Sequence, residues 1–460
     1  MIDISNRKKI NIRDKKITVI GLGMSGTAAA ILANHLGARV FGSDRSENFQ
    51  VGNNALYLLS NHIATETGLH SKKIYDADLW IISPGVPNNA DIVKEAQDRE
   101  IPIVGEIEFA SWYTDSPIVA VTGSNGKTTT VNILSEMCQS ENVQSIMAGN
   151  MGIPFSERVL KELKQPKQNL AYILEISSFQ MEFVLHFCPK IAVYTNLSPD
   201  HLDRHGTMDE YVNMKLAMVK NMRDDGHIVF NADDPQLIMA LDGHDSKLVP
   251  FSMIRTGLTY SIDSKNINTL TGNPLLSVDD ITLPGKHNLS NMLGAATSSS
   301  LMGISDKHIA NVMKTFTGVE HRLENVAIIK NITYINDSKA TNLDSVSVAI
   351  QSFNKPVVLI LGGRNKGADF RLLLPHIKSS HVRDIISYGE AGGQISTAIG
   401  DAVRSVQVTD LNSAVKTAQR LAAPGDVVLL SPGCASFDQF ANFEERGQYF
   451  KMKVMEMMAA

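Results

Sequence analysis

The chain has 460 residues, and because domains usually span roughly 100 to 200 residues, this length predicts about three domains. Hydrophobic residues make up 43% and charged residues 20%, a composition that excludes a disordered or fibrous protein. The formal net charge of −5 offers no basic surface, so no nucleic-acid partner is expected.

The cysteines and the hydropathy pattern indicate the compartment. Cys138, Cys188 and Cys434 lie far apart without a C-x-x-C pair, so neither a disulfide framework nor a zinc site is expected. An apolar run at residues 17–33 is interrupted by glycines where a strand would turn into a helix, which argues against a signal peptide. No stretch has the roughly 18 uninterrupted apolar residues of a membrane span. We therefore expect a cytoplasmic protein without membrane insertion.

Short β-branched runs alternate with longer helical patterns, which is typical of parallel sheets with crossover helices and predicts an α/β fold. In the first unit, strands are expected at residues 17–20, 39–42 and 79–82. A polar break at residues 114–117 then precedes a new strand at 118–121. The first domain is therefore expected over residues 1–115.

The pattern continues in two further units. In the second, residues 116–317, strands are expected at 172–176, 191–195 and 227–231, hairpins near 261–280, and a helix from about residue 287. The segment Thr317-Gly318-Val319 is the next candidate linker. In the third unit, residues 318–460, strands are expected at 333–335, 357–361, 385–388 and 427–430.

The first motif is Gly21-Leu22-Gly23-Met24-Ser25-Gly26, a G-x-G-x-x-G between a strand and a helix, with Asp44 at the end of the next strand. Such glycines let the backbone approach a pyrophosphate at a helix N-terminus, and the acidic residue meets a ribose. Alone, the motif is compatible with NAD, with another nucleotide, or with tight packing of the helix on the strand.

A second glycine-rich loop, residues 122–130 (T-G-S-N-G-K-T-T-T), lies between the strand at 118–121 and an amphipathic helix. Backbone N–H groups of such a loop bind polyphosphate, Lys127 would neutralise the β and γ oxygens, and Thr128 or Thr129 would offer Mg²⁺ a hydroxyl. The general spacing G-x-x-x-x-G-K-[ST] requires a glycine where this chain has Val121, so the loop is a shorter variant. The motif predicts an ATP site.

Polar residues at strand ends complete the candidate site. Glu175 ends an otherwise apolar strand, where a charge is costly to bury without a cation or another partner. The polar loop at residues 196–206 is expected to face the phosphate loop, because ligands of open α/β sheets bind at the carboxyl ends of the strands. In the third unit, His321-Arg322 and polar clusters at 336–342, 362–367 and 431–437 together predict a cleft for phosphates and carboxylates, although an ordinary surface charge is the better explanation of Arg322 or any one lysine alone.

In this order and spacing, the segments G-S-N-G-K-T-T-T, L-E-I-S-S-F-Q, N-L-S-P-D-H-L-D-R-H, H-R-L-E, N-D-S-K-A-T-N and G-G-R-N-K-G resemble the Mur ligases over essentially the whole chain. The segment S-P-G-C-A-S-F-D-Q-F-A-N-F-E-E-R-G is similar to that of the D-glutamate-adding members, and the D-N-P-R motif of the diaminopimelate-adding members is absent. The resemblance implies an N-terminal Rossmann-like domain, a central P-loop ATPase-like domain with a parallel sheet, and a C-terminal Rossmann-like domain.

The resemblance also implies ATP-dependent ligation of D-glutamate to UDP-N-acetylmuramoyl-L-alanine through an acyl phosphate, in peptidoglycan synthesis by a monomer. The first glycine motif would then hold the UDP part of the substrate instead of NAD. The alternatives are another Mur-type amino-acid ligase, a folylpolyglutamate-synthase-like ligase, a nucleotide-binding switch and an NAD-dependent oxidoreductase.

Individual roles follow from the resemblance. The residues implied to be catalytic are Lys127, Glu175, His201, Lys215 and Lys339. The residues implied to bind ATP are Gly123, Ser124, Asn125, Gly126, Lys127, Thr128, Thr129, Asn288, Asn291, Arg322 and Asp337. The residues implied to bind the UDP substrate are Gly21, Gly23, Met24, Ser25, Asp44, Arg45, Ser83, Gly85 and Asn150, and those implied to bind D-glutamate are Thr341, Lys366, Ser436 and Phe443.

Two Mg²⁺ ions are implied, held by Thr128, Thr129, Glu175, His201 and Lys215. Lys215 would take part as a carbamate derived from CO₂, because an ammonium cannot ligate a cation whereas a carbamate resembles a carboxylate. One departure concerns the uracil end: after Asp44 the chain reads Arg45-Ser46, where relatives often place the hydroxyl residue first.

Overall fold

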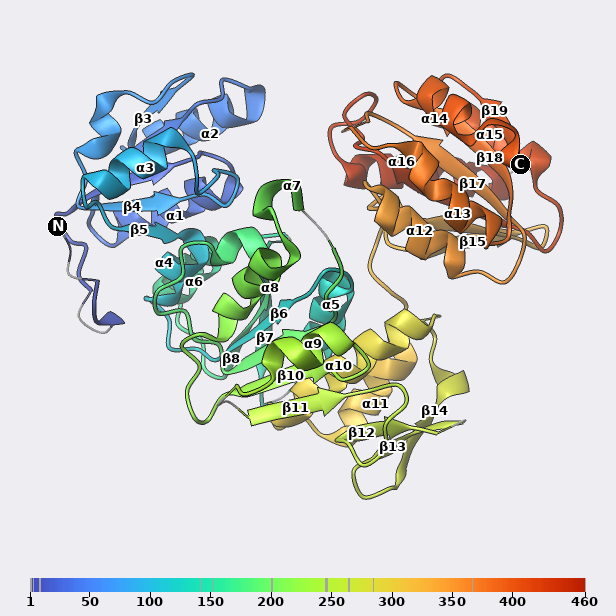
Figure 1. Ribbon diagram of the computed structural model, residues 1–460, viewed down its shortest axis with the longest axis horizontal. Coiled ribbons are helices and arrows are strands. Elements are labelled where there is room, and N and C mark those ends of the chain that lie inside the picture. Colours follow the sequence, from blue (N-terminus) through green and yellow to red (C-terminus); the bar gives the residue numbers. More distant parts are fainter. Residues whose placement is uncertain are drawn as a thin grey trace. The chain divides into compact units, whose positions relative to one another are not determined.

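The computed structural model describes residues 2, 4–7, 10–140, 142–150, 152–199, 202–244, 247–263, 265–283, 285–365 and 367–459. The chain divides into two compact units, Met1–Phe316 and Thr317–Ala460 (Figure 1). The predicted division into three domains stays a prediction. No helix in the described residues is long and apolar enough to cross a membrane.

The first unit begins with a five-stranded parallel sheet in the order β3-β2-β1-β4-β5. Its strands are β1 Lys16–Ile20, β2 Arg39–Asp44, β3 Ala64–Thr67, β4 Leu79–Ile82 and β5 Ile103–Gly105. The accompanying helices are α1 Met24–His35, α2 Phe49–Ser60, η2 Lys72–Tyr75, α3 Asp91–Asp98 and α4 Glu106–Ser111. Because side chains alternate across a strand, Ile17 and Val19 join one core cluster while Ile20 joins the other with Trp80 and Val93. This order is that of the first five strands of a Rossmann fold, so the predicted Rossmann-like domain is confirmed.

The central sheet of the first unit has six parallel strands in the order β11-β10-β9-β6-β8-β7. They are β6 Ile118–Thr122, β7 Gln144–Gly149, β8 Leu170–Glu175, β9 Ile191–Tyr194, β10 His227–Asn231 and β11 Lys247–Phe251. The helices of this part are α5 Lys127–Cys138, α6 Phe155–Lys164, η3 Ser178–Met181, α7 Leu202–His205, α8 Met208–Leu216, η4 Ala217–Val219 and α9 Pro235–Leu241. Strands β6, β8 and β9 are buried throughout, as expected for a sheet covered on both faces.

The predicted hairpins near 261–280 form a small antiparallel sheet, β12-β13-β14. Its strands are Tyr260–Ile262, Asn266–Thr269 and Pro274–Ser277, and η5 Val278–Asp280, α10 Lys286–Leu301 and α11 Asp306–Thr315 follow. The predicted helix near residue 287 is therefore confirmed as α10.

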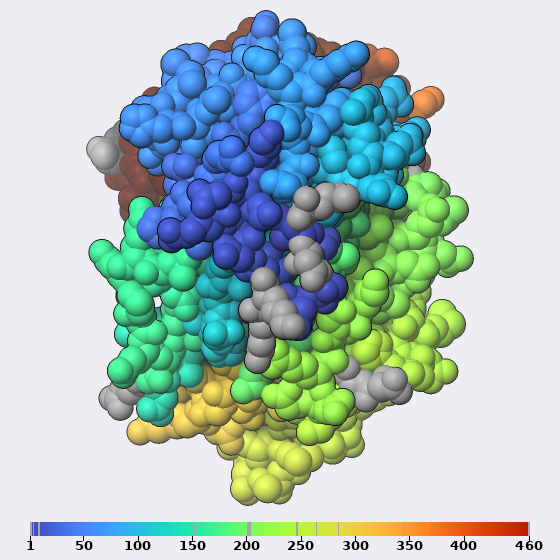
Figure 2. Space-filling view, turned by 90° about the vertical axis from the view of Figure 1, so that its left-hand side faces the viewer, coloured from blue at the N-terminus to red at the C-terminus, as the bar shows by residue number. Residues whose placement is uncertain are grey.

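One continuous core joins the N-terminal and central sheets. It includes Ile17 of β1, Ile107 of α4, Phe155 of α6 and Tyr172 of β8, all fully or almost fully buried. The N-terminal residues, dark blue in Figure 2, lie against the central part, where the carbonyl of Ile4 is 2.6 Å from His186 Nε2. This shared core explains why residues 1–316 form a single compact unit.

The second unit has a six-stranded sheet in the order β15-β16-β20-β17-β18-β19. Its strands are β15 Glu324–Ile329, β16 Ile332–Asn336, β17 Val357–Gly362, β18 Val382–Tyr388, β19 Arg404–Gln407 and β20 Val427–Gly433. The sheet is mixed, because β15 pairs antiparallel with β16 whereas the other pairs are parallel. A parallel sheet was expected here. The difference arises at Lys330 and Asn331, whose φ angles of 50° and 61° suit a two-residue hairpin turn.

Helices cover both faces of this sheet. Val357, Leu359 and Leu361 of β17 pack with α12 Leu343–Gln351, η6 Phe370–Leu373, α13 Leu374–Lys378 and α14 Gly392–Ile399, after which comes η7 Gly400–Ala402. Val358 and Ile360 pack with α15 Leu411–Leu421 and α16 Phe443–Ala459. The second unit therefore has a hydrophobic core on each face of its own sheet.

Candidate active site

The phosphate loop follows β6 and leads into α5. Gly126 caps the helix with φ +84°, and a β-carbon there would lie 2.4 Å from Asn291 Oδ1, so both the backbone angle and the close approach require glycine. Lys127 Nζ donates to the carbonyls of Gly123 (2.8 Å) and Ser124 (2.9 Å). The ammonium is thereby held over the loop that would receive the phosphates.

The segment after β9 lies against this loop, as its place in the sheet predicts. Asn196 accepts two hydrogen bonds from the loop. The Ser124 N–H donates to the Asn196 carbonyl at 2.9 Å, and the Asn125 N–H donates to Asn196 Oδ1 at 2.8 Å. Ser124 Oγ donates to the Ser198 carbonyl at 2.8 Å. His201, three residues further along, lies outside the described residues.

Glu175 is the last residue of β8 and is only 2% exposed. Its Oε1 accepts a hydrogen bond from Asn150 Nδ2 at 2.9 Å, and its buried Oε2 has no hydrogen-bond partner among the described residues. Glu175 pairs in register with Val121, directly before the phosphate loop. A buried carboxylate oxygen in this position suits a cation ligand, since burial of a charge without a partner is costly.

Lys215 reaches the same loop from α8. It is 2% exposed, and its Nζ donates to the Gly123 carbonyl (3.0 Å) and to Thr122 Oγ1 (3.4 Å). The ammonium also lies 4.6 Å from the centre of the Tyr211 ring, and the Tyr211 hydroxyl is 2.9 Å from Ser124 Oγ. Helix α8 therefore brings a buried lysine beside the phosphate loop.

The predicted ATP residues of the first unit that lie outside the loop belong to two neighbouring helices. Thr128 and Thr129 are buried in the first turn of α5. Asn288 and Asn291 are each 6% exposed on α10, which packs against α5. The close approach of Asn291 to Gly126 places this helix at the loop itself.

The first glycine motif opens onto a separate cavity of about 920 Å³. The predicted residues that line it are Gly21, Gly23, Asp44, Arg45, Ser83 and Gly85. Met24, Ser25 and Asn150 are not among the described residues that line it, and Asn150 instead binds Glu175. Of the predicted UDP residues, six thus line this cavity, Met24 and Ser25 begin α1 beside it in sequence, and Asn150 lies near the phosphate loop.

Asp44 organises the wall of this cavity. Its Oδ2 accepts from the backbone N–H of Leu22 at 2.6 Å, and its Oδ1 accepts from that of Ser46 at 2.7 Å. Gly21 has φ +86°, and a β-carbon there would lie 2.8 Å from that of Ser83. The two hydrogen bonds of the Asp44 carboxylate therefore hold the glycine-rich turn to the end of β2.

Arg204, whose role the sequence did not reveal, joins the segment after β9 to this cavity. Its guanidinium bonds to both carboxylate oxygens of Glu182 at 3.1 and 2.9 Å, and to the carbonyls of Pro84 (3.0 Å) and Val86 (3.2 Å). Glu182 is 22 residues away in sequence and lies outside any polar motif. The interaction links the two candidate binding regions of the first unit.

In the second unit, Asp337 follows β16 and is fully enclosed. Ser431 Oγ donates to its Oδ2 at 2.7 Å, and the Leu323 N–H donates to its Oδ1 at 3.2 Å. Burial raises the pKa of Asp337 to about 7, although the nearby charges of Arg322 and Lys339 oppose the rise. These contacts bring the ends of β16 and β20 beside the Arg322 segment.

The three predicted polar clusters of the second unit also meet. The backbones of Arg364 and Ala435 exchange two hydrogen bonds, at 2.8 and 3.0 Å. Arg446, which is completely buried, donates to the Ser338 carbonyl (2.7 Å), to Ser338 Oγ (2.9 Å) and to the Cys434 carbonyl (3.0 Å). Arg446 was not predicted, and only its place in F-E-E-R-G signalled it.

The remaining predicted residues of the second unit lie around these loops. Lys339 Nζ is 6.0 Å from the centre of the Phe443 ring, and the Phe443 carbonyl accepts from Ser338 Oγ at 2.8 Å. Ser436 is buried after β20, and Thr341 is half-buried before α12. Lys366 lies outside the described residues.

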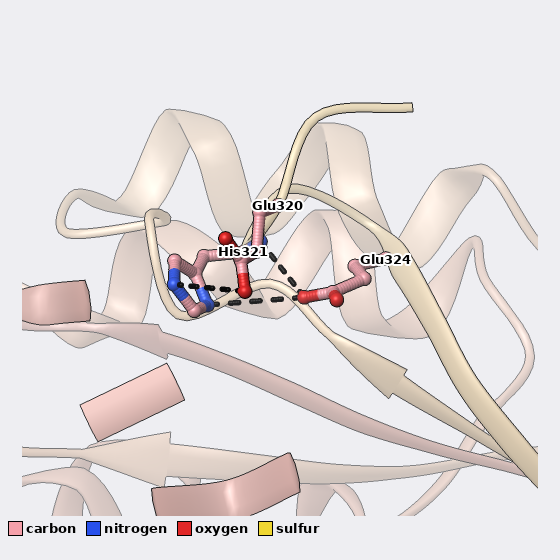
Figure 3. A group of neighbouring side chains, drawn as sticks. All are labelled: Glu320, His321 and Glu324. Carbon is pink, nitrogen blue, oxygen red and sulfur yellow. Dashed lines mark hydrogen bonds and ion pairs between the residues drawn. The ribbon is translucent and has the colours of Figure 1, made fainter. Parts of the chain in front are cut away.

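Glu320, His321 and Glu324 come close enough to suggest a metal site, and their side chains point toward one another (Figure 3). Lys451 already binds both carboxylates, with Nζ at 2.9 Å from Glu320 Oε1 and 2.5 Å from Glu324 Oε1. Asn336 Nδ2 lies 2.9 Å from His321 Nδ1. Because an ammonium meets the two negative charges, the cluster supports the segment that carries Arg322.

These features define a nucleotide-binding α/β protein with a phosphate loop, and the comparisons specify its family. Three family models match: the MurD-like N-terminal domain of Mur ligases at residues 15–105, the Mur ligase middle domain at 121–299, and the Mur ligase glutamate ligase domain at 321–434. The chain belongs to the Mur ligase family.

Relatives match along the whole length. The UDP-N-acetylmuramoylalanine–D-glutamate ligase of Thermoanaerobacter pseudethanolicus is 38% identical, with 97% of this chain and 100% of that protein covered. The ligase of the same name from Christiangramia forsetii is also 38% identical, with 96% and 100% covered. Among solved structures, MurF from Acinetobacter baumannii matches with a TM-score of 0.61 at 16% identity, covering 97% of this chain and 94% of that one, which shows the shared fold.

Proposed function

We propose that this chain joins D-glutamate to UDP-N-acetylmuramoyl-L-alanine with ATP, giving the extended UDP-linked peptide, ADP and phosphate in peptidoglycan precursor synthesis. The observation that carries the proposal is a phosphate loop surrounded by Lys127, Lys215 and the buried Glu175, in a chain similar along nearly its whole length to D-glutamate ligases. Activation by ATP is required because a carboxylate alone is a poor acylating agent.

In the first step, the carboxylate of the UDP substrate attacks the γ-phosphorus of ATP and ADP leaves. Little covalent chemistry falls to the protein in such a transfer, so its task is to position the reactants and to neutralise charge. Lys127, held over the loop by the Gly123 and Ser124 carbonyls, would turn its ammonium to the β and γ oxygens. Asn288 and Asn291 would contact the nucleotide from α10.

Mg²⁺, when bound, would neutralise negative charge on the phosphates. The described residues that would hold it are the Thr128 or Thr129 hydroxyl and Glu175, whose Oε2 has no hydrogen-bond partner among the described residues. His201 and a carbamylated Lys215 are proposed as ligands of a second ion. A carbamate on Lys215 would exchange a buried ammonium for a cation ligand.

In the second step, the amine of D-glutamate attacks the acyl phosphate, and phosphate leaves through a tetrahedral intermediate. Arg322 and Asp337 are proposed to hold ATP, and Lys339 is proposed to lie near the transferred phosphoryl group. Thr341, Lys366, Ser436 and Phe443 are proposed to bind D-glutamate, with Lys366 as the partner of a carboxylate. The first glycine motif and its cavity are proposed to receive the UDP moiety, and we propose a monomer acting in the cytoplasm.

The test is phosphate release from UDP-N-acetylmuramoyl-L-alanine and ATP with D-glutamate, L-glutamate, L-lysine or meso-diaminopimelate as the acceptor. Release with D-glutamate alone is expected. Release with a different acceptor would keep the mechanism and contradict the proposed D-glutamate pocket of Thr341, Lys366, Ser436 and Phe443. No release with any acceptor would contradict the ligase activity itself.

A further inference from the structure

His70 lies in the wall of the N-terminal cavity, three residues after β3, in a segment without any motif. The strand order β3-β2-β1 puts the ends of the three strands in a row. If the pyrophosphate of a nucleotide binds at the Gly21–Gly26 loop after β1, its ribose would lie beside Asp44 at the end of β2. Its base would then lie beside the residues that follow β3.

A chain of hydrogen bonds fixes the His70 ring. Ser43 Oγ lies 2.7 Å from His70 Nδ1 and donates to Glu66 Oε1 at 2.8 Å. Glu66 is held in turn by the Ser71 N–H (2.8 Å, to Oε1) and the Ser71 hydroxyl (2.6 Å, to Oε2). Ser43 is completely buried, so water cannot take either role.

This chain determines the tautomer of the ring. The Ser43 hydroxyl has a single proton, and the Glu66 carboxylate can only accept, so that proton belongs to the Ser43–Glu66 bond. Ser43 Oγ is then an acceptor toward His70, which requires the proton of the neutral ring to be on Nδ1. The other nitrogen, Nε2, is left with a lone pair and has no hydrogen-bond partner among the described residues.

The charges around His70 come from three residues in two segments, the end of β2 and β3. Asp44 at the end of β2 and Glu66 on β3 raise the pKa of the ring, whereas Arg45 lowers it. Burial is the largest influence and lowers the pKa below its ordinary value. At neutral pH the ring is therefore uncharged, and its Nε2 is an acceptor.

We propose that His70 is a specificity residue for the nucleobase, and that its Nε2 accepts a hydrogen bond from the imide N3–H of uracil. Cytosine has a lone pair at this position, which would face the lone pair of Nε2, so the residue selects uracil over cytosine. This inference rests on the proposed UDP substrate and adds the group that reads its base.

The experiment measures binding of UDP, 3-methyl-UDP and CDP to the full-length protein by calorimetry. We expect UDP to bind at least about 10-fold more tightly than either analogue, because a site built to accept a hydrogen bond rejects ligands that cannot donate it. His70→Gln can place an amide oxygen near the position of Nε2 and should retain the preference. His70→Asn occupies only the Nδ1 position and should lose it.

Two controls make the result decisive. Each variant should bind an ATP analogue and unfold thermally as the unmodified protein does, which shows that the fold is intact. As the pH falls from 7.5 to 5.5, the unmodified protein should lose UDP affinity relative to His70→Gln. The protonated His70 ring carries a proton on both nitrogens, so it can no longer accept a hydrogen bond from the uracil N3–H.

Equal binding of UDP and 3-methyl-UDP, or a preference that survives in His70→Asn, would overturn the role of His70 while leaving the ligase proposal in place. Failure of the unmodified protein to bind UDP would overturn both.

Discussion

At the scale of single residues, substitution of Lys127 is the most direct test of the proposed ATP site. Lys127→Ala should lower the rate of ADP release by at least about 100-fold, since removal of one preorganised charge-stabilising donor typically costs that much. A coupled assay of ADP formation measures the change. Lys161→Ala, which removes an exposed lysine in the last turn of α6, should have no effect. Near-normal turnover in Lys127→Ala would contradict the assignment of the loop.

The buried carboxyl of Glu106 should make stability depend on pH. Glu106 begins α4, is 2% exposed, and accepts from the Ser156 N–H at 2.6 Å. Burial raises its pKa from 4.5 to about 7. The pKa of Glu106 is higher in the folded state than in the unfolded state, so the free energy of unfolding is highest below pH 4.5. It falls by about 3 kcal/mol as the pH rises through 7.

Glu106→Gln removes this titration. The thermal midpoint of the variant, relative to the unmodified protein, should therefore rise between pH 5 and pH 8, as scanning calorimetry would show. Glu157→Gln on the exposed surface of α6 is the matched control and should show no such trend. A constant difference between pH 5 and pH 8 for Glu106→Gln would rule out the proposed titration.

Residues within local motifs were predictable, and residues with distant partners were not. The phosphate loop could be read from the sequence because its chemistry needs particular residues at a fixed spacing. Arg446 binds Ser338, 108 residues earlier, and His70 depends on Ser43, 27 residues earlier. No local pattern encodes such pairs, so they become visible only in the folded chain.

At the scale of elements, the predicted and missed strands differ in one physical respect. The strands predicted within the three larger sheets are interior strands, such as β6, β10 and β17, with apolar side chains directed to both covered faces. The missed strands β3, β5, β7, β11, β15 and β19 are all edge strands. Sequences such as A-T-E-T in β3 and R-S-V-Q in β19 are partly exposed and lack a continuous apolar run.

Helix α8 offers a test of how an element positions its lysine. Thr207 and Glu210 form a capping box at its start: the Thr207 hydroxyl accepts from the Glu210 N–H, and the Glu210 carboxylate accepts from the Thr207 N–H. Thr207→Ala should cost about 1 kcal/mol of stability. Because α8 carries Lys215, the variant should also lower the rate of ADP release.

The control is the cap of another helix in the same unit. Ser305 caps α11, where its hydroxyl accepts from the His308 N–H. Ser305→Ala should lose about as much stability, about 1 kcal/mol, yet keep normal ADP release, because α11 carries no proposed site residue. Chemical denaturation and the ADP assay measure the two effects. Equal losses of activity in both variants would show that general destabilisation, and not the position of α8, is responsible.

At the scale of the whole molecule, the chain has two compact units, and the second contains cores on both faces of its own sheet. A unit with its own core is expected to fold alone. Residues 317–460, produced separately, should therefore unfold in one cooperative transition, which circular dichroism with temperature would detect. A broad, non-cooperative transition would mean that the second unit depends on the first for its fold.

The residues proposed to bind ATP are divided in sequence between the two units, because Lys127 and Asn291 belong to residues 1–316 whereas Arg322 and Asp337 belong to residues 317–460. Neither unit alone should release ADP in the presence of all substrates. Mixed at micromolar concentration, they should recover much less activity than the intact chain, because a covalent connection supplies an effective concentration in the millimolar range. Activity that rises with the concentration of the added second unit would support a role for residues 317–460 in the reaction. Full activity from residues 1–316 alone would instead confine the ATP site to the first unit and remove Arg322 and Asp337 from it.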